Sequence, residues 1–153
     1  MGKPSFVYVT YIQTTPETLW NALLDPEMTK DYWGRHRNVS DWKTGSAWRH
    51  EDYDDANNVR VVGTVLESNP PHRLVLSWAS PEKGDDPAKQ SRVTFDIEPY
   101  MGEVRLTVTH EDLDNEMLRR VSGGWPAILS SLKTLLETGK AMPMTQKRWS
   151  GKS

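Results

Sequence analysis

Two histidines are the residues of this chain best suited to proton transfer. His110 ends an apolar row that includes Val104, Leu106 and Val108, and His50 follows Trp48 on the same face of a predicted strand. Histidine is the side chain that titrates near neutral pH, so either residue could move a proton or contact a ligand. A histidine on an apolar face is more often a core residue, and that interpretation stays open for both.

No other motif in the chain points to a catalytic or metal site. The four histidines (36, 50, 72 and 110) have none of the spacings HxH, HxxxH or HExxH, and the chain contains no cysteine. There is also no GxSxG element and no P-loop. We therefore predict no metal, no cofactor and no catalytic set, although the two histidines keep a proton-transfer enzyme open as an alternative.

Tryptophan is abundant, with seven residues against two phenylalanines. An indole combines a large apolar body with one N–H donor, which suits the wall of a ligand cavity as well as an ordinary core. Our candidate cavity wall, predicted to hold a small hydrophobic or aromatic molecule, comprises Trp33, Trp48, His50, Trp78, Phe95, His110 and Trp125. A completely filled core is an equally good interpretation of the pattern.

Composition argues against several classes of partner. The formal net charge is −2, from 19 basic and 21 acidic residues, and no basic stripe predicts nucleic-acid binding. No stretch approaches the roughly 20 apolar residues of a membrane span, so membrane insertion is not expected. The start of the chain lacks the apolar segment of a secretory signal, and the absence of cysteine fits a reducing compartment, so we predict a cytoplasmic protein. No feature identifies a protein partner or an oligomeric state.

Periodicity predicts an α+β order of elements. Residues 6–13 predict a strand, Thr15 and Pro16 begin a short helix that ends at Asp25-Pro26, and 27–33 predict a second short helix. Six strands are then expected near 39–42, 46–53, 58–68, 72–80, 90–100 and 103–111. A long helix follows to about Thr138, with a break or kink expected at 122–126 because Pro126 follows two glycines.

The short connections between these strands predict antiparallel neighbours. Pro70-Pro71 cannot continue a ladder, so the runs on either side should form a hairpin. A curved sheet of six or seven strands is expected to wrap around the long C-terminal helix. We predict one domain over 1–153, with its core at about 6–138 and a tail at 140–153 whose basic end, KRWSGKS, is solvated.

Four segments resemble one known family in the correct order. They are "TTPETLWNALLDPEMTKDYWG", "DWKTGSAW", "VVGTVLESNPPHRLVLSW" and "SGGWPAILSSLKTLLETG". They are similar to the opening helices, strand–turn–strand, double-proline hairpin and terminal helix of the activator of heat-shock protein 90 ATPase homologue-like family, within the START-like (SRPBCC) superfamily. The chain departs from the family pattern at Lys43 and Ser46.

This resemblance implies the helix-grip fold of the birch-pollen allergen, with a cavity between sheet and C-terminal helix that often holds hydrophobic or aromatic small molecules. It implies no catalytic set, because the superfamily hosts several functions on one fold. Three hypotheses follow: a small-molecule binding module, a cyclase-like enzyme that uses His50 or His110 in the same cavity, and a heat-shock protein 90 ATPase-activator-like interaction domain.

Overall fold

The chain folds into a curved antiparallel sheet that wraps around one long helix, as a computed structural model shows for residues 3–150. The strands are β1 (Phe6–Ile12), β2 (His36–Val39), β3 (Ala47–Asp52), β4 (Val59–Asn69), β5 (Arg73–Trp78), β6 (Ser91–Tyr100) and β7 (Glu103–Glu111). The helices are α1 (Pro16–Leu24), α2 (Pro26–Tyr32), α3 (Asn115–Thr138) and α4 (Pro143–Gln146), with short 3₁₀ turns η1 (Pro81–Lys83) and η2 (Pro87–Lys89). The α+β helix-grip prediction is confirmed.

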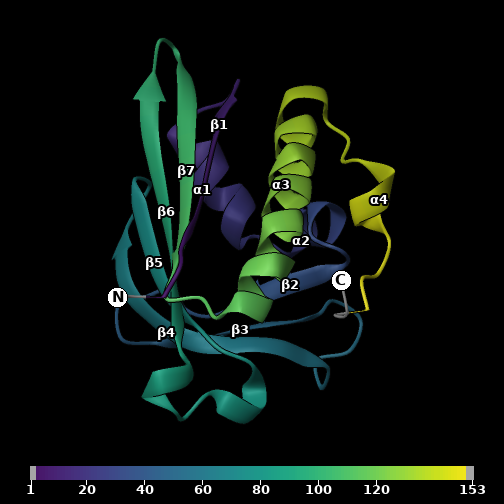
Figure 1. Ribbon diagram of the computed structural model, residues 1–153. Coiled ribbons are helices and arrows are strands. Elements are labelled where there is room, and N and C mark those ends of the chain that lie inside the picture. Colours follow the sequence, from purple (N-terminus) through teal and green to yellow (C-terminus); the bar gives the residue numbers. More distant parts are fainter. Residues whose placement is uncertain (1–2, 151–153) are drawn as a thin grey trace.

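The seven strands follow the order β1-β7-β6-β5-β4-β3-β2, with every neighbouring pair antiparallel. The predicted hairpin at Pro70-Pro71 is confirmed, because Asn69 of β4 pairs with Arg73 of β5 directly across it. Figure 1 shows the sheet bending into a half-barrel, with α3 lying along its concave side. The inner surface of β2–β5 therefore faces the N-terminal half of α3.

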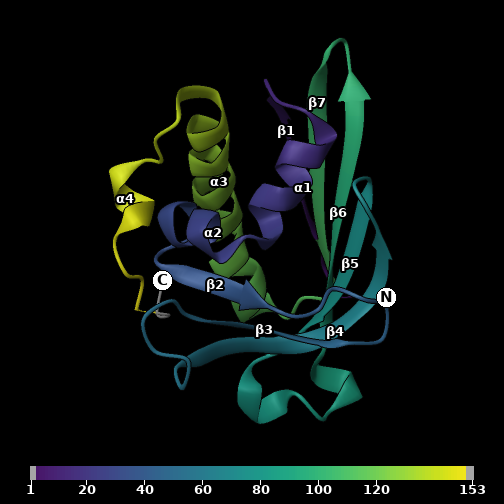
Figure 2. The same cartoon turned by 180° about the vertical axis from the view of Figure 1, so that it is seen from behind.

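Helices α1 and α2 connect β1 and β2, the two edge strands of the sheet. The Thr15 side chain caps α1 by accepting a hydrogen bond from the Thr18 N–H, as the sequence predicted. Asp25 ends α1 and caps α2, since its carboxylate accepts from the Glu27 N–H. Helix α1 packs on β6 and α2 packs on β2 and α3, so both helices lie beside α3 when the molecule is seen from behind (Figure 2).

Helix α3 is continuous from Asn115 to Thr138, so of the break or kink expected at 122–126 the break is wrong. Pro126 removes one backbone hydrogen bond, but the helix buries an apolar face on both sides of it, through Val121 and Trp125 before the ring and Ile128, Leu129 and Leu132 after it. Packing against the sheet outweighs the cost of proline inside a helix, about 3 kcal/mol, because each of these five side chains contributes about 2 kcal/mol on burial.

The second strand lies three residues earlier than predicted, at His36–Val39 instead of 39–42. The backbone turns after Val39, where Trp42 adopts a positive φ of 61°, and residues 40–46 form a loop. This shift matters for the site, because it places His36 and Asn38 on the buried side of the sheet.

The basic end of the chain packs against the domain, which corrects the expectation of a solvated tail for the part up to residue 150. Arg148 pairs with the buried carboxylate of Asp52, with 2.6 Å between Nε and Oδ2. Trp149 lies against Gly34, where an added Cβ would come within 2.5 Å of the indole ring. The tail is held in place because the Arg148 guanidinium pairs with a buried carboxylate and the Trp149 indole packs on an apolar surface. Residues 151–153 of the tail lie outside the described part.

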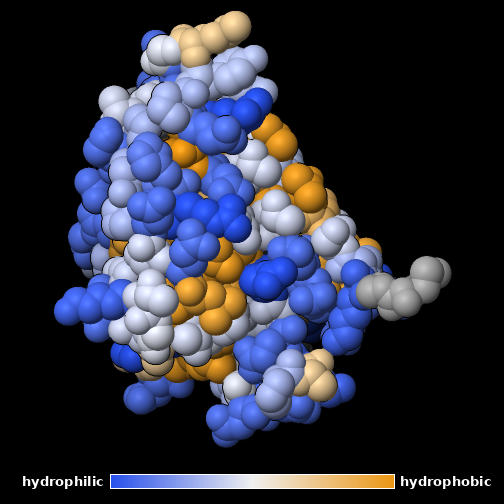
Figure 3. Space-filling model, turned by 90° about the vertical axis from the view of Figure 1, so that its left-hand side faces the viewer, coloured by the Kyte–Doolittle hydropathy of each residue, from blue (hydrophilic) through white to orange (hydrophobic). Residues whose placement is uncertain are grey.

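The core lies between the sheet and the helices, and the outer face of the sheet is mainly polar, apart from the exposed side chains of Val7, Val9 and Tyr11 on β1. Along β7, Val104, Leu106, Val108 and His110 are buried and alternate with partly exposed residues, as the period of two predicted. The outward Arg92 pairs with Glu111 across two strands. Figure 3 shows one side of the molecule as mainly hydrophilic, with separate small apolar clusters.

Candidate functional site

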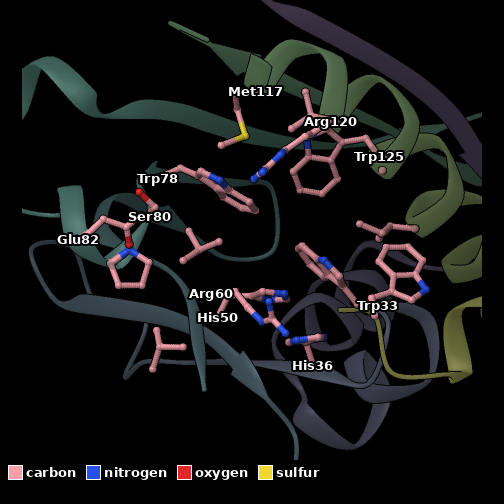
Figure 4. A pocket seen from close by; sticks show the side chains of 17 residues that line it. Trp33, His36, His50, Arg60, Trp78, Ser80, Glu82, Met117, Arg120 and Trp125 are labelled. Carbon is pink, nitrogen blue, oxygen red and sulfur yellow. The ribbon is translucent and has the colours of Figure 1, made fainter. Parts of the chain in front are cut away.

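A cavity of ≈ 350 Å³ lies between the N-terminal half of α3 and the inner surface of β2–β5. This volume falls within the range of small-molecule sites in proteins. Helix α3 contributes Met117, Arg120, Val121, Gly124, Trp125 and Ile128, and the sheet contributes His36, His50, Val59, Arg60, Val61 and Trp78. Trp33, Trp149 and the segment Ser80–Glu82 complete the wall, and Figure 4 shows these side chains surrounding the space.

Three indoles form the apolar part of this wall. Trp125 of α3 lies edge-on to Trp33, with ring centroids 5.4 Å apart, and it meets Trp78 of β5 at 5.7 Å. These separations suit favourable aromatic contacts. All three residues are at most 9 % exposed. The wall is thus a rigid aromatic surface drawn from three separate parts of the chain.

His110 fixes Trp125 from behind and does not line the cavity. The Trp125 indole N–H donates to His110 Nδ1 at 3.1 Å, and His110 Nε2 lies 2.8 Å from Ser91 Oγ. An indole nitrogen can only donate, so Nδ1 must be the acceptor and the proton of the neutral ring must sit on Nε2. Ser91 Oγ then accepts from Nε2 and donates to the Trp78 carbonyl at 3.2 Å.

This chain of hydrogen bonds requires an uncharged imidazole. A second proton, on Nδ1, would face the Trp125 N–H with no acceptor. Burial also disfavours the charged form and lowers the pKa of His110 to about 4. His110 therefore acts as a neutral positioning residue for the indole wall.

The other end of the cavity is polar and is built from two stacked histidines. The rings of His36 and His50 lie 5.0 Å apart at an angle of 15°. His36 Nδ1 donates to the Gly34 carbonyl at 2.8 Å, and His50 Nδ1 lies 2.7 Å from Asn38 Oδ1. The second atom of the Asn38 amide, Nδ2, donates to Leu23, which fixes Oδ1 as the acceptor toward His50.

Both rings are therefore protonated on Nδ1 when neutral. Burial lowers the pKa of His36, and the hydrogen bond to Gly34 partly opposes this shift. The positive charge of Arg60 lowers the pKa of His36 further. Burial likewise holds the pKa of His50 well below its usual range, and the neighbouring His36 and Arg60 lower it further. At neutral pH the pair presents uncharged rings to the cavity.

A β-bulge brings Arg60 to the same end. Strand β3 pairs His50 with Val61 and the next residue, Glu51, with Val59, so Arg60 has no partner residue across the ladder. In a regular strand Arg60 would point away from the face that carries Val59 and Val61. All three residues line the cavity. Figure 4 shows Arg60 beside the two histidines, across the space from Met117 and Arg120 of α3.

Four of the seven predicted wall residues line the cavity, namely Trp33, His50, Trp78 and Trp125. Trp48, Phe95 and His110 lie one layer behind them. Trp48 donates to the Ser77 carbonyl at 2.8 Å and packs on Trp78, and Phe95 meets Trp125 edge-on at 5.8 Å. The layer behind the wall consists of residues that hold its indoles in place.

Sequence reasoning missed His36, Arg60 and Trp149. The misplaced second strand left His36 outside any regular element, and the bulge at Arg60 has no sequence signature. The tail that contains Trp149 was predicted to be solvated, although its large apolar indole is a side chain typical of packed segments.

Residues 3–150 bear on metal binding and on membrane insertion. No group of three or more histidine, aspartate or glutamate side chains in this part is arranged to hold a metal ion. Within the same range, none of the helices is both long and apolar enough to cross a membrane.

The half-barrel, the long helix that it grips and the cavity between them define a helix-grip domain of the START-like class. The sequence matches the profile of the activator of Hsp90 ATPase homolog 1-like proteins over residues 13–137, and the chain belongs to this family. The match ends before α4 and the packed tail, so Trp149 lies outside the matched residues.

Solved structures share the fold. ChR145 from Cytophaga hutchinsonii is 28% identical with a TM-score of 0.71, over 91% of this chain and 97% of that one. The Aha1 dimer from Colwellia psychrerythraea is 19% identical with a TM-score of 0.71, over 90% and 99%. CalU16 from Micromonospora echinospora is 20% identical with a TM-score of 0.70, over 88% and 77%. Among curated proteins, no sequence match is found.

Proposed function

We propose that the protein binds a small hydrophobic or aromatic molecule in the cavity between α3 and the sheet. The observation that carries the proposal is the space of ≈ 350 Å³ that the side chains leave unfilled beside three indoles. Trp33, Trp78 and Trp125 offer large rigid apolar surfaces, which bind flat ring systems with little loss of side-chain entropy.

Helix α3 keeps this space open at Gly124. The residue lines the cavity, and a Cβ added there would meet no atom within 4 Å. Alanine is preferred over glycine inside helices by about 1 kcal/mol, so stability alone would favour a side chain at this position. The missing side chain is therefore consistent with a requirement for room.

The test is a ligand panel of flavonoids, fatty acids and polycyclic aromatic compounds, followed by tryptophan emission and thermal unfolding. A bound compound should quench the indoles, and at 100 times its dissociation constant it should stabilise the fold by about 2.7 kcal/mol. For a domain of this size that corresponds to a rise in Tm of about 5 to 10 °C.

Gly124→Leu and Gly123→Leu form a matched pair for this test. Both lie in α3, but Gly123 is exposed and outside the cavity, whereas Gly124 faces the open space. Gly124→Leu should fold and fail to bind, and Gly123→Leu should bind as the wild type does. If no compound of the panel changes emission or Tm, or if Gly124→Leu binds normally, the proposal fails.

A cyclase-like reaction in the same cavity is the second candidate, and of the two histidines predicted for it, His50 and His110, only His50 lines the cavity. His50 lines the cavity, and in residues 3–150 no hydrogen-bond partner is found for its Nε2. With Nδ1 protonated, this nitrogen carries the lone pair of a general base. Turnover of a bound compound that is unchanged in His50→Ala would remove this candidate.

A further inference from the structure

The polar end of the cavity contains an arginine, Arg60, that has no carboxylate partner among the described residues. Arg60 is half-buried, and within residues 3–150 it makes no ion pair with any carboxylate. Its Nη1 donates to the Ser150 carbonyl at 2.6 Å, while Nε is buried and has no hydrogen-bond partner. A guanidinium has five N–H donors, so most of its hydrogen-bonding capacity is unused.

Buried cations in proteins are normally paired, because removing an unpaired charge from water is costly. The carboxylates near this end of the cavity pair with other arginines. Arg148 holds Asp52, and Arg37 and Arg49 both hold the buried Glu51, in the first case with Nη2 and Oε2 2.7 Å apart. None of these carboxylates is paired with Arg60, so the side chains of residues 3–150 leave its charge uncompensated.

The neighbouring imidazoles do not compensate it either. His36 and His50 are neutral, and His36 Nε2 is buried without a hydrogen-bond partner among the described residues. Two further charges lie near the mouth, Glu82 on the exposed rim and Arg120 on α3, and Arg120 pairs with Glu116 at 3.4 Å. Figure 4 places Glu82 on the opposite side of the space from His36.

We propose that the ligand of this cavity is an aromatic or hydrophobic acid, whose ring system lies among the three indoles and whose anionic group, a carboxylate or its equivalent, pairs with Arg60. This inference rests on the proposed binding function and narrows it to a chemical class. The planar guanidinium suits an acid group, because it offers parallel N–H donors to two oxygens at once. The bulge in β4 explains how the strand turns this cation toward the cavity.

The probes are 2-naphthoate and 2-naphthamide, which share a ring system and differ in the charge of the head group. Their dissociation constants are measured at pH 7.5 by calorimetry with the full chain. The acid should bind about ten- to one-hundredfold more tightly than the amide, since a hydrogen bond to a charged group contributes more than one between neutral groups. In Arg60→Met this preference should disappear, with the affinity for the amide nearly unchanged.

Arg119→Met is the matched control, because Arg119 is exposed on α3 and lies outside the cavity. The Arg119→Met variant should keep the preference for the acid. This result would distinguish a specific contact with Arg60 from a general electrostatic effect of losing one positive charge. Binding of the amide also shows whether Arg60→Met is folded. If this variant binds neither probe and its circular dichroism spectrum is that of an unfolded chain, Arg60→Lys replaces it. Arg60→Lys should retain a reduced preference for the acid.

The possible results distinguish failure of the acid preference from failure of the proposed binding function. Equal binding of acid and amide by the wild type would overturn the acid preference and leave a neutral-ligand cavity standing. A preference that survives in Arg60→Met would also overturn it. If neither probe binds, the inference fails, and the panel of compounds with the Gly124→Leu variant decides the binding function independently.

Discussion

The hydrogen bonds around His110 predict how strongly acid should destabilise the fold. The folded-state pKa of about 4 lies below the value of 6.5 for an unperturbed histidine, so the unfolded chain takes up this proton first. The contribution to stability is therefore fully present above pH 6.5 and is lost as the pH falls toward 4. Between pH 7.5 and 5.0 the loss from this single group is about 2 kcal/mol.

His36 and His50 have pKa values shifted in the same direction, so the wild type should lose more than this amount. The variant His110→Gln isolates one contribution, because glutamine can accept and donate hydrogen bonds but does not titrate. It should be less stable than the wild type at pH 7.5, and its further loss on going to pH 5.0 should be smaller by about 2 kcal/mol.

The measurement is urea unfolding at both pH values, with His72→Gln as the control, since the His72 side chain is exposed in the β4–β5 turn. The control should lose as much stability as the wild type. An acid-induced loss in His110→Gln equal to that of the wild type would refute the assignment of a neutral His110 held by Trp125 and Ser91.

Four further predictions concern packing, and each is measured by urea unfolding at pH 7.5. Gly63→Ala should cost about 3 kcal/mol or more, since its Cβ would lie 1.9 Å from the Ser77 carbonyl oxygen; a loss below 1 kcal/mol would contradict the close approach of β4 and β5. Gly123→Ala, exposed in α3, should instead stabilise the fold by about 1 kcal/mol, and a loss would argue against a regular helix there. Trp149→Ala should cost about 2 kcal/mol, because the indole is half-buried, and no change would mean that the tail is not docked. Gly34→Ala should lose less stability in the Trp149→Ala variant than in the wild type, because the clash with the indole is then gone. Only the strain of the positive φ at residue 34, about 1 kcal/mol, should remain. If the losses of the two substitutions simply add, Trp149 does not contact Gly34.

The elements of the fold were predictable where local chemistry decides them. Thr15 with Pro16 marks the start of α1, and Pro70-Pro71 marks the reversal between β4 and β5. The expected break at Pro126 was wrong because tertiary packing outweighs one missing hydrogen bond, and packing is not visible in a local pattern.

The site was predictable only in part, for a related reason. Large rings on apolar faces identified Trp33, Trp78 and Trp125, but periodicity could not separate the wall from the layer behind it. Arg60 reaches the cavity through a bulge, which breaks the period of two on which the assignment of faces depends.

The docking of the tail brings together residues more than 90 positions apart, such as Arg148 and Asp52. A pairing of that kind depends on the completed fold, so local sequence chemistry gives no indication of it.

The central claim is that a small molecule lies among the indoles, and the indole N–H signals in a ¹H–¹⁵N NMR titration test it most directly. With the tightest-binding compound of the panel, the signals of Trp33, Trp78 and Trp125 should shift in a saturable manner. The signal of Trp20, buried in α1 and not part of the cavity wall, should stay in place. Shifts confined to tryptophans outside the cavity, or no shift with any compound, would contradict the account.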